Sequence, residues 1–203
     1  MSEHMALENL TVLDLTRVLA GPFCTMMLAD MGANVIKIEV PKGGDDTRSY
    51  PPFRAKNLNG ERESVYFANI NRNKKGITLN LKAPEGKEIF KELVKKADIV
   101  VENYRPGVMD KLGLGYDVLK EINPRIIYAA VSGFGCYGPY HLRPGYDILA
   151  QAMGGMMSIT GSKGGEPTRA GSALGDILGG LHVTIGILAA VNARTITGKG
   201  QRT

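Results

Sequence analysis

The stretch TVLDLTRVLAGPFCTMMLADMGANVIKIE, residues 11–39, decides the fold of this chain. It contains a short apolar segment at residues 11–15, an apolar helical segment at residues 23–31 that ends at Gly32, and a second short apolar segment at residues 34–39. A strand, a helix and a strand within about 30 residues form a βαβ unit, whose strands are parallel and whose crossover is right-handed. We therefore predict an α/β domain built on a parallel sheet.

The rest of the chain extends this unit. Strand patterns follow at residues 76–81, 98–102 and 125–131, and helical patterns at residues 64–71, 84–96 and 146–157. Alternating strands and helices of this kind predict a doubly wound, mostly parallel, Rossmann-like sheet. The helix at 84–96 is expected to pack through four apolar side chains, Ile89, Phe90, Leu93 and Val94.

Residues 40–64 are polar and rich in Gly, Pro and charge, which predicts a long surface excursion. Residues 1–4 resemble a cloning remnant, and we assign residues 5–203 to a single α/β domain.

Composition narrows the class of protein. Lys and Arg number 25 and Asp and Glu number 20, giving a net charge of +5 without a long basic block, so nucleic acid is not an expected partner. The two cysteines, Cys24 and Cys136, form no CxxC motif and no signal peptide is recognisable, which favours a reducing cytoplasm. The apolar run at residues 177–191 is shorter than a membrane span needs, so we expect a buried helix and no membrane contact.

One carboxylate precedes that apolar run, in RAGSALGDILGGLHVTIGILAAVNAR, residues 169–194. Asp176 falls where the N-cap or first turn of the helix is expected, so it is either a capping residue or a reactive carboxylate favoured by the helix dipole. Three glycines around it, Gly175, Gly179 and Gly180, leave space for a large molecule to approach the backbone.

Polar residues also gather where predicted strands begin or end. Residues 17–20, 71–75 and 103–105 could line one crevice beyond the carboxyl ends of the strands, although residues 71–75 alone would equally suit a solvated turn. Glu39 ends the second strand and could hold a ribose, but the glycine fingerprint of dinucleotide-binding folds is missing from the first turn.

The order of several motifs resembles the class III CoA-transferases, the family of formyl-CoA transferase and carnitine-CoA transferase. The motifs are VLDLTRVLAGPFCTMMLADMGANVIKIE, NRNKKGITLNL, ADIVVENYRPGVMDKLGL, NPRIIYAAVSGFG, PGYDILAQAMGGMMSITG and GSALGDILGGLHVTIGILAAV. They are collinear from about residue 7 to residue 201, which makes the resemblance specific.

The resemblance implies roles for individual residues. Asp176 matches the catalytic aspartate, and the matched contacts with CoA are made by Val18, Leu19, Ala20, Asn71, Arg72, Asn73, Lys74, Asn103, Tyr104, Arg105, Lys111, Ser132, Gly133, Phe134 and Gly135. Two positions depart from the family pattern. Val40 stands where some relatives have a CoA-binding arginine, and Leu19 stands where formyl-CoA transferase has a glutamine.

The resemblance also implies a reaction. CoA would pass from an acyl-CoA, such as succinyl-CoA, to a carboxylic acid through anhydride and aspartyl-CoA thioester intermediates on Asp176. CoA is then a substrate, and no metal or permanently bound cofactor is expected. Family members form interlocked homodimers and continue into a smaller second domain, so this chain resembles their N-terminal portion, and we expect it to be inactive alone.

Two alternatives remain. An α-methylacyl-CoA racemase would use a His and an Asp, but Tyr146 stands where those enzymes have a histidine, and we interpret His182 as a satisfied core residue. A non-catalytic CoA-binding module is the second alternative.

Overall fold

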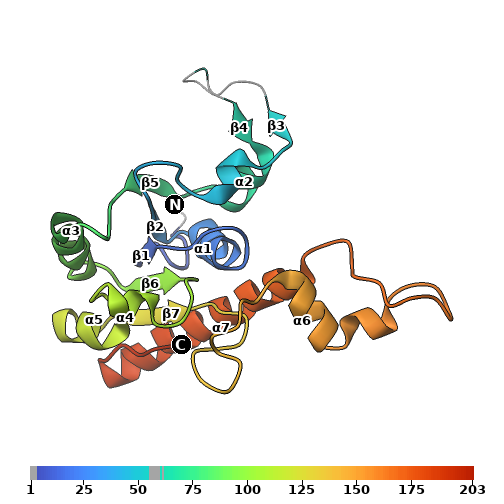
Figure 1. Cartoon of the computed structure of the whole chain (residues 1–203). Coiled ribbons are helices and arrows are strands. Elements are labelled where there is room, and N and C mark those ends of the chain that lie inside the picture. Colours follow the sequence, from blue (N-terminus) through green and yellow to red (C-terminus); the bar gives the residue numbers. More distant parts are fainter. Residues whose placement is uncertain (1–3, 55–59, 61) are drawn as a thin grey trace.

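Figure 1 shows the computed structural model, which describes residues 4–54, 60 and 62–203. Five parallel strands form one sheet in the order β5-β2-β1-β6-β7. They are β1 (Thr11–Asp14), β2 (Asn34–Glu39), β5 (Lys75–Thr78), β6 (Ile99–Glu102) and β7 (Ile127–Ala130). The predicted α/β fold and parallel sheet are confirmed, although β5 and β7 are shorter than the sequence pattern indicates.

The strand order identifies the point where ligands bind in open α/β sheets. The chain moves outward from β1 to β2 and β5, and then returns to place β6 on the other side of β1. The topological switch point therefore lies between β1 and β6, where the loops that follow these two strands lead to opposite sides.

Helices cover both faces of the sheet, as expected for a doubly wound fold (Figure 1). Because successive strand residues point to opposite faces, Val12 packs with α1 and α7 whereas Leu13 packs with α3 and α5. The five helices are α1 (Ala20–Asp30), α7 (Leu174–Thr197), α3 (Pro84–Val94), α4 (Val108–Lys111) and α5 (Tyr116–Ile122). Phe90 and Val94 of α3 are buried as predicted, but Ile89 is 51% exposed, so its assignment to the core was wrong.

Most described residues of the excursion after β2 are exposed, as predicted, but a few of them pack into the domain. The excursion contains the 3-10 helix η1 (Asp46–Ser49) and a hairpin of β3 (Phe53–Arg54) and β4 (Glu63–Ser64), which leads into α2 (Val65–Ile70). Ser64 caps α2, since its Oγ accepts a hydrogen bond from the Phe67 N–H at 3.2 Å. Asp45 and Thr47 are buried, which corrects the expectation that the whole excursion is a surface segment.

The helix predicted at residues 146–157 is two elements, α6 (Asp147–Met153) and η2 (Met156–Ile159). Two glycines separate them, and Gly155 adopts the left-handed conformation with φ of 80°. This region extends away from the sheet (Figure 1).

Helix α7 is longer and more exposed than the sequence indicated. Its buried residues form a narrow stripe of Gly180, Thr184, Ile187, Ala190 and Arg194. Leu178, Ile185 and Ile196 are exposed, which corrects the expectation of a buried helix. By length and composition alone α7 could cross a membrane, and 22% of its apolar window is buried, but the core helix of a soluble protein meets the same two criteria. The α7 stripe packs on the sheet and α1.

Candidate active site

The loops at the switch point are joined by a pair of hydrogen bonds. The Arg17 N–H donates to Asn103 Oδ1 at 2.9 Å, and Asn103 Nδ2 donates to the Arg17 carbonyl at 2.7 Å. Arg17 follows β1 and Asn103 follows β6, so a side-chain amide from one strand end fixes the backbone at the other. The structure therefore brings together these two parts of the predicted crevice.

Helix α1 begins at this point. Its first residue is Ala20, its N-cap is Leu19, and no side chain within the described residues caps it. The first-turn N–H groups and the helix dipole favour an anion or a developing oxyanion here. Gly21 allows the close turn into the helix, because a Cβ on it would lie 2.4 Å from Thr16 Cβ.

A buried ion pair between Lys74 and Asp14 contacts the start of α1. Lys74 Nζ lies 3.0 Å from Asp14 Oδ2 and also donates to Thr25 Oγ1, Asn71 Oδ1 and the Pro22 carbonyl at 2.8–3.0 Å. Burial alone would raise the pKa of Asp14, but the charges of Lys74 and a neighbouring lysine outweigh burial and lower that pKa. Burial also lowers the pKa of Lys74, and the attraction of Asp14 opposes that shift.

These contacts change the interpretation of residues 71–75. The Lys74 side chain is 2% exposed, and Asn71 is also buried, so neither belongs to a solvated turn. Lys74 also lacks the exposure that a contact with a CoA phosphate requires. Residues 71–75 reach Asp14 because β5 pairs with residues 36–39 of β2. This register places the start of β5 level with the end of β1, on the other side of β2.

Arg72 and Asn73 lie elsewhere. Both donate hydrogen bonds to the carboxylate of Asp30 at the last turn of α1, Asn73 Nδ2 at 2.8 Å. Since α1 has 11 residues, this end lies about 15 Å from Ala20. The structure thus does not place Arg72 and Asn73 in the same crevice as residues 18–20.

The residues after β6 and β7 surround a small cavity of about 10 Å³, enough for one water. Tyr104 and Ser132 line it together with Glu102, whose carboxylate accepts hydrogen bonds from the Tyr104 N–H at 2.7 Å and from Tyr128 Oη at 3.1 Å. Burial raises the pKa of Glu102 to about 7, because the two hydrogen bonds and the charge of Arg202 lower that pKa less than the loss of solvent raises it.

The loop after β7 is closed at its neck by two glycines. A Cβ on Gly133 would lie 2.3 Å from the Gly145 Cα, so only glycine fits at this approach. Within the loop, Phe134 packs edge-on against Tyr140 with ring centroids 5.9 Å apart, and Gly135 adopts a left-handed φ of 77°. Residues 133–135 therefore have a defined backbone course.

Arg105 and Lys111 are exposed cations beyond the end of β6. Neither forms a side-chain hydrogen bond or ion pair with any residue that the structure describes. Both are thus accessible to an anionic ligand.

Asp176 is the third residue of α7, not its N-cap, which is Ala173. Gly180, one turn later on the same face, touches the start of α1, and a Cβ on it would lie 2.5 Å from the Ala20 carbonyl oxygen. Asp176 lies on the same face of α7 as Gly180, one turn before it. The close packing of Gly180 on Ala20 therefore brings the start of α7 near the switch point.

A second carboxylate lies beside Asp176. Asp147, the first residue of α6, accepts hydrogen bonds from the Gly175 N–H and Gln151 Nε2, both at 2.8 Å. Burial, and then the charge of Asp147, raise the pKa of Asp176. Burial, followed by the charge of Asp176, also raises the pKa of Tyr66 on α2.

Two further residues, considered for ribose binding and for racemase chemistry, also have defined surroundings in the structure. Glu39 accepts hydrogen bonds from Arg48 at 2.6 and 2.7 Å and from the Asp45 N–H at 2.8 Å, so its oxygens are not free for a ribose. His182 is exposed and its Nδ1 lies 2.8 Å from the Leu178 carbonyl, so the expectation of a core histidine was wrong.

Comparison with known proteins identifies the family of this chain. Residues 7–203 match CoA-transferase family III. The chain belongs to that family. Acetyl-CoA:oxalate CoA-transferase of Acetobacter aceti is 50% identical over 95% of this chain and 48% of that protein. Succinyl-CoA:glutarate CoA-transferase of Mus musculus is 50% identical over 96% of this chain and 43% of that protein.

The fold of this family III chain also matches a solved structure. A CAIB/BAIF family protein from Brucella suis superposes with a TM-score of 0.94 at 46% sequence identity, covering 98% of this chain and 52% of that chain. The chain spans about half the length of the relatives it matches.

Sequence reasoning missed four residues at this candidate site: Lys37, Asp45, Tyr66 and Asp147. Lys37 did carry a signal, because it interrupts the apolar strand NVIKIE. Asp147 follows the PGY of a motif that was recognised as a whole, without a role for its carboxylate. Nothing in the local sequence distinguishes Tyr66 or Asp45, since their importance depends on contacts between distant segments.

Proposed function

We propose that this protein transfers CoA from an acyl-CoA to a carboxylic acid, with Asp176 as the nucleophile. The observation that carries the proposal is the position of Asp176, on the face of α7 that packs through Gly180 on the start of α1, near the switch point of a family III fold. A carboxylate in this position lies near N–H groups that can stabilise the oxyanion of an attacked thioester.

The reaction begins with the ionised Asp176, which attacks the thioester carbonyl. The C–S bond breaks, CoA leaves as a thiolate, and a mixed anhydride remains on the aspartate. The thiolate then attacks the aspartyl carbonyl, releasing the donor acid and forming an aspartyl-CoA thioester. The acceptor carboxylate attacks this thioester to form a second anhydride, and the returning thiolate cleaves it to give the new acyl-CoA and free Asp176.

CoA is proposed to lie along the loops at the carboxyl edge of the sheet. Residues 18–20, residues 103–105 and residues 132–135 border this edge from the ends of β1, β6 and β7. Lys111 and Arg105 supply exposed positive charge for the phosphates. Arg72 lies far from Ala20, which suits a contact with a part of CoA remote from the thioester.

The substrate pair is proposed from the relatives. Their names specify succinyl-CoA with glutarate and acetyl-CoA with oxalate, so a short acyl-CoA and a dicarboxylate are the first pair to test. We further propose a cytoplasmic homodimer without a permanently bound cofactor. The exposed apolar residues of α7, such as Ile185, support an additional packing partner for that helix.

Trapping the acyl-enzyme tests this proposal. The full-length protein is incubated with succinyl-CoA or acetyl-CoA and quenched with hydroxylamine, and its peptides are then mapped by mass spectrometry. We expect a hydroxamate on the peptide that contains Asp176, and none on the same peptide of an Asp176→Asn variant. An adduct on Asp147 or Glu166 instead would contradict the assignment.

A further inference from the structure

A second buried ion pair lies directly beneath residues 17–20. Lys37 Nζ and Asp45 Oδ2 are 2.9 Å apart, and both side chains are almost completely buried. Lys37 lies in β2 and Asp45 in the excursion that follows it, so the pair joins two separate segments.

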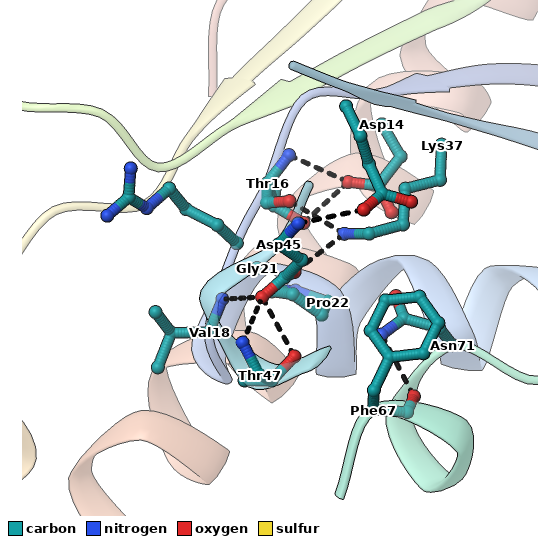
Figure 2. A network of polar contacts seen from close by, with 12 residues as sticks. Asp14, Thr16, Val18, Gly21, Pro22, Lys37, Asp45, Thr47, Phe67 and Asn71 are labelled. Atoms are coloured by element: carbon teal, nitrogen blue, oxygen red, sulfur yellow. Dashed lines mark hydrogen bonds and ion pairs between the residues drawn. The ribbon is translucent and has the colours of Figure 1, made fainter. Parts of the chain in front are cut away.

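The pair contacts the backbone on both sides of Arg17. Lys37 Nζ donates a hydrogen bond to the Thr16 carbonyl at 2.8 Å, and the Val18 N–H donates to Asp45 Oδ1 at 3.3 Å. Figure 2 shows Asp45 between Val18 and Thr47, with Lys37 next to it. One ion pair thus holds a carbonyl and an N–H that are two residues apart.

The backbone between these contacts is strained. Val18 has φ of 68°, in the left-handed region that a β-branched residue rarely adopts. Such a conformation persists only where the surrounding contacts enforce it. The Lys37–Asp45 pair, together with the amide of Asn103 on Arg17, supplies those contacts.

We propose that Lys37 and Asp45 are positioning residues that hold Val18 in its left-handed conformation and so fix the backbone of residues 18–20 for CoA. The proposal rests on the function proposed above, in which these residues contact CoA. It adds that the affinity for CoA depends on two side chains that do not themselves touch the ligand.

The test uses calorimetric titration of CoA into the full-length protein. Removing Asp45 alone would leave the charge of Lys37 buried without its ion-pair partner, so the informative variant is Lys37→Met/Asp45→Ala, in which both charges are absent. Released from its contacts, Val18 should leave the left-handed region, and we expect the Kd of CoA to rise about tenfold. Adding Val18→Gly should recover at least about threefold of that loss, because glycine adopts a positive φ without steric cost.

The matched control is Asp46→Asn. Asp46 lies next to Asp45 and binds the same loop through Arg17 at 2.6 Å, but this pair is exposed, so the Kd should change by less than about twofold. Amide hydrogen exchange without ligand gives a second readout. Exchange at Val18 should accelerate in the double variant and stay unchanged in Asp46→Asn.

The outcomes separate the two proposals. A wild-type protein that does not bind CoA would contradict the proposed function, while exchange at Val18 would still test the positioning role. If wild type binds CoA and the folded double variant shows unchanged affinity and unchanged exchange, the positioning role is wrong. A Val18→Gly substitution that weakens binding further would also overturn it.

Discussion

Two groups of carboxylates lie within one domain and differ in burial and in their partners. At and beyond the ends of β1 and β2, the buried Asp14 faces Lys74 and the buried Asp45 faces Lys37. At the start of α7, Asp176 faces Asp147 and no cation within hydrogen-bonding distance in the described chain. Burial raises the pKa in both places, but the lysines outweigh it for Asp14 and Asp45, whereas Asp147 adds to it for Asp176.

The difference in partners indicates different roles for the two groups of carboxylates. A carboxylate held by a lysine and several hydrogen-bond donors has its electron pairs engaged, so it fixes the backbone and is a poor nucleophile. A carboxylate without a cation keeps its electron pairs available, and its raised pKa makes the anion more basic and hence more reactive. The first group suits positioning, and the second suits covalent chemistry.

The largest effect is expected from Asp176→Asn. The amide cannot form the acyl anhydride, so transfer should fall by roughly three orders of magnitude or more. Stability should change by less than about 1 kcal/mol, because Asp176 is not the N-cap and the folded protein pays to ionise it. Steady-state transfer and urea unfolding measure the two quantities, and an active variant would remove the distinction between the groups.

The next largest effect is a loss of stability in Lys74→Met. This change leaves the buried Asp14 without its cation, which should cost about 3–5 kcal/mol. The neighbouring Lys75→Met is the control, since Lys75 is exposed and its side chain donates to Asn34 Oδ1, and it should cost less than about 0.5 kcal/mol. Equal urea midpoints for the two variants would contradict a structural role for Lys74. Because a substitution of Lys74 would also destabilise the fold, the effect of charge on CoA binding is better tested with Arg72→Ala.

The sequence predicted the sheet well because its signals are local. The apolar strands and the turns that end them depend on neighbouring residues, and those at residues 11–14 and 34–39 form as predicted. The predictions for α7 and Ile89 failed where exposure depends on which segments pack against a helix. An apolar run indicates a helix, but it does not indicate how many of its faces are covered.

The site was predictable only in part, for a similar reason. The switch-point loop and Asn103 follow from strand ends, which local patterns locate. The burial of Lys74 depends on the register between β5 and β2, and Asp45 lies in a segment whose composition suggests solvent. Contacts between segments far apart in the chain have no local sequence signal.

Glu102 gives an intermediate case, because it is buried and hydrogen-bonded, and the charge of Arg202 lowers its pKa less than burial raises it. Its pKa of about 7 exceeds the ordinary 4.5, so the folded protein binds this proton more tightly than the unfolded chain does. Stability should therefore fall as the pH rises from about 4.5 through 7, by roughly 3 kcal/mol in all.

Glu102→Gln tests this expectation. The variant should lose that part of the pH dependence, whereas Glu121→Gln, at an exposed position on α5, should retain it. Urea unfolding between pH 5 and pH 8 gives the comparison. If Glu102→Gln kept the full pH dependence of stability, burial would not be enough to raise the pKa of Glu102. The same explanation for the raised pKa of Asp176 would then weaken.

The smallest effect is expected from Asp147→Asn, and it bears most directly on the comparison. Removing the charge of Asp147 should lower the pKa of Asp176, because that charge is the second of the two causes that raise it. Burial remains, so the pKa should stay above its ordinary value. Asp147 Oδ1 accepts from the Gly175 N–H, and asparagine can retain that bond through its own oxygen.

The acid limb of the pH profile of kcat/KM should therefore move to lower pH, since more Asp176 is ionised at a given acidic pH. Below the limb the variant should be faster than wild type by less than about tenfold, and near neutral pH the two should differ little. Asp117→Asn removes an equal charge from exposed α5 and should leave the limb in place. A limb that moves upward or stays fixed in Asp147→Asn would mean that the pair of carboxylates does not set the ionisation of Asp176. The contrast with the lysine-paired carboxylates would then rest on the lysines alone.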